Sequence, residues 1–115
     1  MSSTRKAVLT TIEKHGGLLF YPTLYEGFEF SENCVYSGCA PNQNIIPLAR
    51  YLLNTFGNRF YLVGSNYVYP YETNRIMRDF IVSSGGKVLE ERYLPLLPAE
   101  GDVQAILSDI KKHEG

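Results

Sequence analysis

The chain has 115 residues, of which 44% are hydrophobic and 20% charged, and its net charge is −1 at pH 7. This composition is typical of an ordinary globular protein, and the length allows one independently folded domain at most. The near-neutral charge argues against nucleic acid as a direct partner, because binding to phosphates needs a cationic face. No apolar run is long enough to span a membrane and no signal peptide is visible, so we expect a cytoplasmic protein.

The first predicted element is a helix over residues 4–14, which Gly16-Gly17 ends. Val8, Thr11 and Ile12 are expected to form its buried face.

Two short buried strands are predicted over residues 18–21 and 34–37, with a loop over residues 22–32 between them. Cys34 is expected to be a small core residue on the second strand, and Cys39 to lie on the loop after it. With no second cysteine pair and no histidine nearby, a zinc site is not expected, and a disulfide would be unusual in a reducing compartment.

A strong helix follows, because apolar residues recur at helical spacing. Pro47 is expected in its first turn, where proline is tolerated, and Gly57 is expected to end it. Residues 59–64 form a continuous apolar run, which is typical of a parallel strand covered on both faces. The apolar residues of the helix are Ile45, Leu48, Ala49, Leu52, Leu53 and Phe56.

The last part of the chain repeats this alternation of helix and strand. Gly85-Gly86 should end a helix, residues 87–93 form a strand, and Asp102 should cap a final helix. The order αβ-β-αβ-αβ-α predicts an α/β fold with a mostly parallel sheet and flanking helices. The apolar positions of the two helices are Ile76, Met77, Phe80 and Ile81, and Val103, Ile106, Leu107 and Ile110.

Signatures of catalysis and of cofactor binding are missing from the sequence: there is no nucleotide-binding glycine loop, no nucleophile elbow and no metalloprotease motif. His15 and His113 are expected to be exposed residues at helix ends. Glu26, Glu29 and Glu32 could bind a cation, but a solvated acidic face is the favoured interpretation. We therefore expect no enzyme activity, no catalytic residue, no metal site and no cofactor.

Two tyrosine-proline loops follow apolar strands, and these are the strongest functional signal. Tyr21 and Thr23 follow one strand, and Tyr67 and Tyr69 follow another. Ligands of open α/β folds bind at the carboxyl ends of strands, and the i, i+2 spacing aims both members of a pair the same way if each segment is extended. Four neutral hydroxyl groups would suit a small uncharged ligand with C=O and N–H groups, such as an amide or urea.

The alternative is that these tyrosines only pack against their neighbours. The same interpretation applies to the half-buried positions expected for Tyr25, Tyr51, Tyr61 and Tyr93.

Several ungapped segments resemble one known family, the type I periplasmic-binding-protein-like amide and urea receptors. The resemblance is closest to the amide-sensing negative regulators of aliphatic amidase expression, followed by the urea-binding proteins of ABC transporters. It extends over essentially the whole chain. The segments are Ser3-Thr4-Arg5-Lys6-Ala7-Val8, Tyr21-Pro22-Thr23, Tyr25-Glu26-Gly27-Phe28-Glu29, Ala40-Pro41-Asn42-Gln43-Asn44 and Gly64-Ser65-Asn66-Tyr67-Val68-Tyr69-Pro70.

The resemblance implies a fold of two α/β lobes that close on a ligand, of which this chain covers less than a third. Residues 1–43 would be part of the first lobe and residues 44–115 part of the second. The ligand contacts carried over from the amidase regulators are those of Tyr21, Thr23, Tyr67 and Tyr69.

The sequence also departs from the family pattern. Leu24 stands where the family motif usually has proline, which would change the pocket near the ligand's alkyl end. A serine and a tyrosine of the family's first-lobe site are expected to fall before Met1, and a second-lobe threonine after Gly115.

Three functions are consistent with these features. The first is non-catalytic sensing of a small amide, with amidase regulation as its output, or binding of urea or a short-chain amide for an ABC transporter. The second is contact with a regulatory protein, such as an antiterminator, without ligand binding. The third, a small flavodoxin-like enzyme, is disfavoured because no phosphate-binding loop is visible. Open strand edges predict a homo-oligomer, and a periplasmic location would require a signal peptide upstream.

Overall fold

The computed structural model describes residues 2–113. The predicted order of helices and strands is confirmed. The elements are α1 (Ser2–Lys14), β1 (Leu19–Tyr21), β2 (Cys34–Tyr36), α2 (Pro41–Phe56), β3 (Arg59–Ser65), α3 (Val68–Ser83), β4 (Lys87–Leu94) and α4 (Glu100–Lys112).

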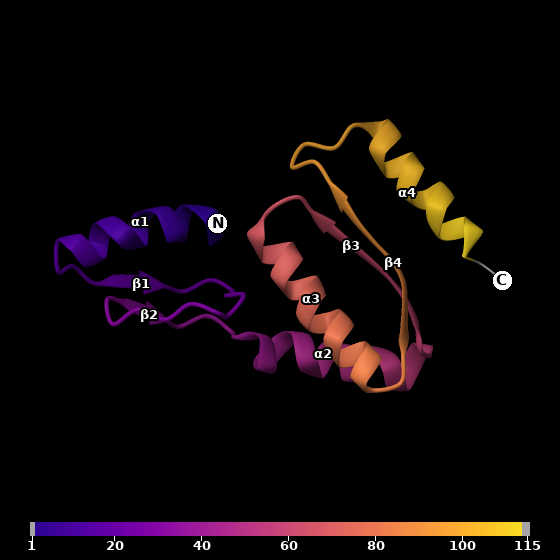
Figure 1. Ribbon diagram of the computed structural model, residues 1–115, viewed down its shortest axis with the longest axis horizontal. Coiled ribbons are helices and arrows are strands. Elements are labelled where there is room, and N and C mark those ends of the chain that lie inside the picture. The colour runs from indigo at the N-terminus through magenta and orange to yellow at the C-terminus, as the bar shows by residue number, and fades with distance from the viewer. Residues whose placement is uncertain (1, 114–115) are drawn as a thin grey trace.

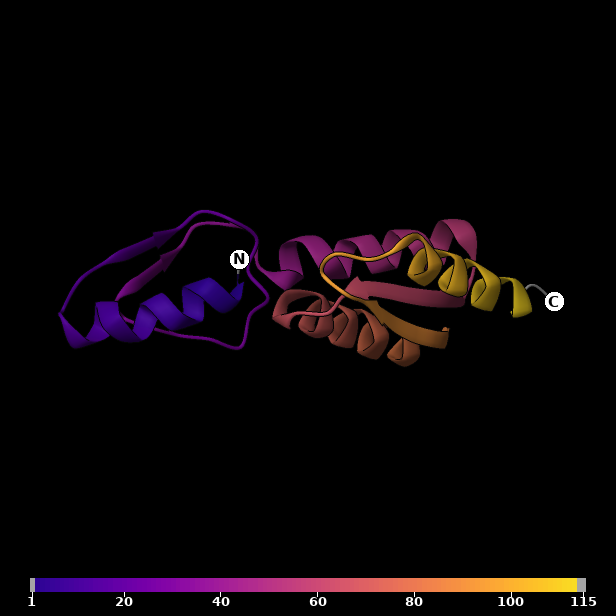
Figure 2. The ribbon, with the colours of Figure 1, turned by 90° about the horizontal axis from the view of Figure 1, so that it is seen from above.

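The elements form two separate units rather than one continuous sheet. The N-terminal unit contains α1, β1 and β2, and the C-terminal unit contains α2, β3, α3, β4 and α4 (Figure 1). The chain passes between them from β2 into α2 (Figure 2). The molecule measures 56 × 33 × 17 Å, and its radius of gyration is 16.9 Å, against about 13 Å for a compact domain of this length. The fold is therefore α/β, as predicted, but divided and elongated.

In the N-terminal unit, the two strands are parallel and pair Leu19 with Cys34. A loop, residues 22–33, makes the crossover between them without a helix. Helix α1 packs beside this sheet, where Leu9 and Cys34 are buried.

The buried side of α1 differs from the predicted one. Ser2, Arg5 and Leu9 are buried, whereas Val8 is 42% exposed and Thr11 is exposed as well. The expectation failed because the loop between the strands supplies carboxylates to Arg5, which turns the polar side of the helix inward.

In the C-terminal unit, strands β3 and β4 are parallel. Helices α2 and α3 cover one face of this sheet, and the core of the unit lies there. Helix α4 lies against the other face, where the hydroxyl of Tyr61 donates to Asp109 at 2.7 Å. That cover is incomplete, because Val63 is 42% exposed, so the prediction of a strand covered on both faces holds only in part. The buried core residues are Ile45, Ala49, Leu62, Met77 and Ile81.

Helices α2 and α4 begin in the same way, with a side chain in the first turn folding back on the preceding residue. The Gln43 side chain accepts the Ala40 N–H at 2.9 Å, and Asp102 accepts the Ala99 N–H at 2.9 Å. Helix α2 therefore starts at Pro41, which places Pro47 in its second turn, not the first as predicted. Asp102 likewise lies inside α4 instead of preceding it.

Cys34 is buried on β2 and Cys39 is exposed on the following loop, as predicted, and both are free thiols. Within residues 2–113, no helix combines the length and the apolar character needed to cross a membrane.

Candidate functional site

A pocket of about 300 Å³ lies between the two units. The structure brings all four residues predicted from the tyrosine-proline loops to this one pocket. Two further residues, Ser2 and Leu24, complete its lining, and the full set is Ser2, Tyr21, Thr23, Leu24, Tyr67 and Tyr69.

The first wall of the pocket follows the carboxyl end of β1. Tyr21 is the last residue of that strand, and its carbonyl accepts the Ser37 N–H at 3.1 Å. The chain leaving β2 passes so close that a Cβ atom on Gly38 would lie 1.8 Å from the Thr23 carbonyl oxygen. Only glycine allows this approach, so Gly38 lets the chain after β2 pass directly against the backbone of Thr23.

The second wall is formed by the start of α3. Tyr67 precedes the helix with extended backbone angles (φ −159°, ψ 173°), and Tyr69 lies in the first helical turn. The extended segment on which the i, i+2 argument depended is therefore not present here, yet Tyr67 and Tyr69 both line the same pocket. A Cβ on Gly64 would lie 2.8 Å from the Pro70 side chain, so this glycine lets α3 begin directly over the end of β3.

Behind the first wall lies a buried ion pair between Arg5 of α1 and Glu26 of the loop. The side chains of Arg5 and Glu26 are 0% and 1% exposed, and the two Arg5 terminal nitrogens contact the Glu26 oxygens at 2.5 and 3.2 Å. Arg5 Nε also donates to Glu29 at 2.7 Å. The predicted solvated acidic face is thus wrong for these two glutamates, because a cation distant in sequence neutralises them.

Arg5 also contacts the pocket indirectly through an aromatic ring. Its guanidinium lies 4.7 Å from the centre of the Tyr21 ring, a distance at which a cation is attracted to the ring face. Tyr36 adds to the same cluster, since its hydroxyl donates to Glu29 at 2.7 Å. Burial and this hydrogen bond raise the pKa of Tyr36 well above its usual value.

Arg5 and Glu26 remain ionised as a cation and an anion that pair with each other. Burial alone would raise the pKa of Glu26, but hydrogen bonds from Arg5 and Ser2 outweigh it, and the pKa is lowered below its usual value. Burial alone would likewise lower the pKa of Arg5. The hydrogen bonds and charges of Glu26 and Glu29 outweigh this effect, so the pKa is raised above its usual value and the guanidinium stays charged. The Glu26 carboxylate and the Arg5 cation therefore persist at neutral pH.

Ser2 connects this ion pair to the pocket. It is 3% exposed, lines the pocket, and donates from Oγ to Glu26 Oε2 at 2.7 Å. Ser2 was not among the site residues predicted from the sequence, because a serine at the start of a helix is the ordinary capping residue.

A contact between the units lies near the pocket, in the loop that carries Glu26. Phe28 has a positive φ of 60°, a region that aromatic residues rarely adopt. The Arg75 guanidinium of α3 lies 4.4 Å from the centre of its ring. This pair joins the N-terminal loop to the helix that carries Tyr69.

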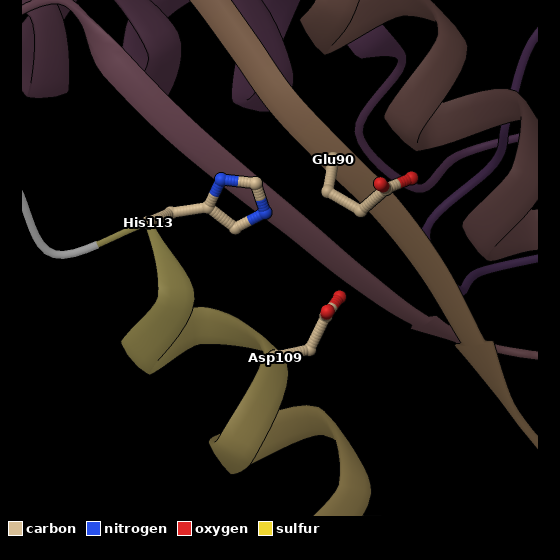
Figure 3. A group of neighbouring side chains, drawn as sticks. All are labelled: Glu90, Asp109 and His113. Carbon is tan, nitrogen blue, oxygen red and sulfur yellow. The ribbon is translucent and has the colours of Figure 1, made fainter.

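A second cluster, outside the pocket, contains Glu90, Asp109 and His113, whose ligand atoms lie within 4.8 Å of one another. Figure 3 shows the three side chains converging between β4 and α4. The two carboxylates already pair with Arg92, at 3.5 Å from Glu90 and 3.3 Å from Asp109. We interpret the cluster as an ion-pair group that holds α4 on the sheet. His113 is half-buried here, not exposed as predicted, whereas His15 is exposed as predicted.

The pocket itself is uncharged among the described residues. Its lining provides the hydroxyls of three tyrosines, one threonine and one serine, together with the apolar side chain of Leu24. Hydroxyl groups both donate and accept hydrogen bonds. The lining can therefore satisfy the C=O and N–H groups of a small neutral molecule, while a free carboxylate or ammonium would lack a countercharge.

Comparison with known protein families identifies one matching family. The sequence model of the periplasmic binding protein domain matches residues 1–115. The match extends over both units and both tyrosine-proline loops. The chain therefore belongs to the periplasmic binding protein domain family.

Proposed function

We propose that this protein binds a small neutral amide, such as acetamide, and acts as a non-catalytic sensor in the regulation of amidase expression. The observation that carries the proposal is the convergence of Tyr21, Thr23, Tyr67 and Tyr69, from two units, on one uncharged pocket. The resemblance to amidase regulators at these same residues supports the amide as ligand.

The pocket is small for a ligand site, and hydroxyl groups predominate in its lining. About 300 Å³ is at the lower end of the range for small-molecule sites. The best small ligands gain at most about 1.5 kcal/mol per heavy atom, so a molecule as small as acetamide needs most of its polar groups bonded. A wall of hydroxyl groups meets that requirement.

The absence of catalysis is supported by the chemistry of Ser2. A serine becomes a nucleophile when a neighbouring base takes its proton. The neighbour here is Glu26, whose lowered pKa makes it a poor proton acceptor at neutral pH. Ser2 therefore stays a neutral hydroxyl and serves as a hydrogen-bonding group.

Urea or a short-chain amide carried to an ABC transporter is the related alternative within the same ligand class. The regulatory role implies a cytoplasmic location and the transport role a periplasmic one. The regulatory role also implies a protein partner, for which an antiterminator is our candidate.

The proposal is tested by recording amide-proton NMR spectra of the chain during titration with acetamide, urea and acetate. We expect acetamide or urea to shift the resonances of Tyr21, Thr23, Tyr67 and Tyr69, and acetate to leave them unchanged. Dispersed peaks that no amide moves would contradict ligand binding and favour protein contact as the role.

A pair of variants separates pocket binding from general effects. Tyr67→Phe removes one pocket hydroxyl and should weaken acetamide binding about tenfold, the equivalent of one hydrogen bond of roughly 1 kcal/mol or slightly more. Tyr51→Phe is the control, because Tyr51 is 58% exposed on α2 and does not line the pocket. Equal effects of the two variants would argue against the assigned pocket.

A further inference from the structure

The contacts of Ser2 determine whether its hydroxyl acts as a hydrogen-bond donor or as an acceptor. Ser2 Oγ lies 2.7 Å from Glu26 Oε2, and both side chains are buried. An ionised carboxylate can only accept hydrogen bonds, so the serine must be the donor in this pair. Its single proton is then committed to Glu26, and only the lone pairs of Oγ remain for the pocket.

Arg5 keeps Glu26 in the state that this arrangement requires. Its guanidinium contacts both carboxylate oxygens, and its Nε is bound in turn by Glu29. A planar guanidinium that bridges two carboxylates fixes their orientation as well as their charge. Glu26 can therefore neither rotate away from Ser2 nor become a donor at neutral pH.

We infer that Glu26 is a positioning residue that makes Ser2 a hydrogen-bond acceptor toward the ligand, so that the pocket selects molecules with an N–H group. This inference rests on the proposed function, and it identifies the N–H group as the part of the ligand that the site recognises. A primary amide or urea supplies the donor. A ketone of the same shape has no N–H group to donate to Ser2 Oγ. A carboxylate would be repelled by the lone pairs of Ser2 Oγ, and it would also find no countercharge in the pocket.

The isosteric pair acetamide and acetone tests the inference, because acetone has a methyl group where acetamide has its NH₂ group. We expect the wild-type chain to bind acetamide about 10- to 100-fold more tightly than acetone, since a buried acceptor left unpaired is costly. In Glu26→Gln the new NH₂ group can donate to Ser2 Oγ, which frees the serine proton to face the pocket. The ratio of the two affinities should then fall by about tenfold.

Glu29→Gln is the matched control. Glu29 also binds Arg5, at 2.7 Å, but it has no contact with Ser2 among the hydrogen bonds of residues 2–113. Loss of its charge should therefore lower stability without changing the ratio of acetamide to acetone affinity. A purely structural role of the network would predict the same ratio in both variants.

Three outcomes are decisive. If the wild-type chain binds neither probe, the proposed function fails, and the inference with it. If it binds acetamide but Glu26→Gln and Glu29→Gln keep the wild-type ratio, the inference alone is overturned. If Glu26→Gln does not fold, Ser2→Ala replaces it, and a ratio unchanged by removal of the acceptor overturns the inference.

Discussion

Among single residues, Arg5 and Glu26 have the largest energetic consequence. Their side chains are almost completely buried, and removing one partner of a buried ion pair typically costs about 3–5 kcal/mol, because the other charge is left without a partner. For a small domain this is a large part of the total stability. The pair therefore belongs to the structural basis of the pocket, although neither residue lines it.

The pH dependence of stability follows from the lowered pKa values of Glu26 and Glu29. Both carboxyl groups have a lower pKa in the folded chain than the value of about 4.3 in the unfolded chain. Their stabilisation is thus complete above about pH 5 and is lost as the pH falls through the folded pKa values. We expect the melting temperature to drop between pH 5 and 3, measured by circular dichroism.

The control for this pH profile is Glu26→Gln, which cannot titrate at that position. Its melting temperature should be lower at pH 7 and should change less between pH 5 and 3. A profile as steep as that of the wild type would assign the acid sensitivity to other carboxyl groups.

Gly38 is the residue whose replacement should disturb the pocket most directly. In Gly38→Ala the new Cβ would lie 1.8 Å from the Thr23 carbonyl oxygen, so the backbone must move. We expect a loss of more than about 2 kcal/mol in the free energy of unfolding, measured in urea. Gly101→Ala is the matched control, because nothing lies within 4 Å of its Cβ inside α4, and it should be neutral or gain up to about 1 kcal/mol. Equal losses would contradict the close approach.

At the scale of elements, α2 carries an unfavourable residue in its interior. Pro47 is exposed in the second turn of the helix, where it lacks the N–H that would bond to the Gln43 carbonyl. We expect Pro47→Ala to raise the free energy of unfolding by about 1–3 kcal/mol. Asn54→Ala, at another exposed position of α2, should gain only about 0.5 kcal/mol. A loss of stability in Pro47→Ala would mean that the proline makes a packing contact that outweighs the missing bond.

The start of α3 shows where local sequence signals mislead. The apolar spacing of the sequence marks this helix only from Ile76 onward, and tyrosine and valine at positions 67–69 by themselves favour extended structure. In the structure Val68 already begins the helix, with Pro70 in the first turn, where proline costs little. Pro70 lies so close to Gly64 that a Cβ atom on the glycine would be 2.8 Å from it, and this approach arises only when the helix folds back on β3.

At the scale of the whole molecule, the pocket depends on how the two units are held together. The Phe28 ring and the Arg75 guanidinium form a contact across the units, 4.4 Å apart. Exposed cation–π pairs contribute about 0.5–1 kcal/mol, so Phe28→Ala should weaken acetamide binding by about two- to fivefold without unfolding the chain. Calorimetry would measure this. Phe30→Ala, in the same loop and 85% exposed, should leave the affinity unchanged.

Uncovered sheet surface supports the proposed homo-oligomer. Phe20 and Val35 are opposite one another in β1 and β2 and are 65% and 41% exposed. A two-stranded sheet with an open apolar face is marginal on its own. We expect light scattering to detect a dimer or larger species, which Phe20→Glu should dissociate. Leu97→Glu, at an exposed loop position, is the control, and a monodisperse wild-type monomer would contradict the proposal.

The order of elements, the α/β class and the loops that face the pocket could all be predicted from the sequence. These features depend on hydrophobic period, glycine and proline positions and motifs, all of which are local. The buried side of α1 and the burial of Glu26 as an ion pair could not be predicted. The residue that pairs with this carboxylate is Arg5, 21 residues away in the sequence. The place of Ser2 in the pocket lining emerged only from the folded chain, because burial and pairing of charges depend on contacts between distant segments.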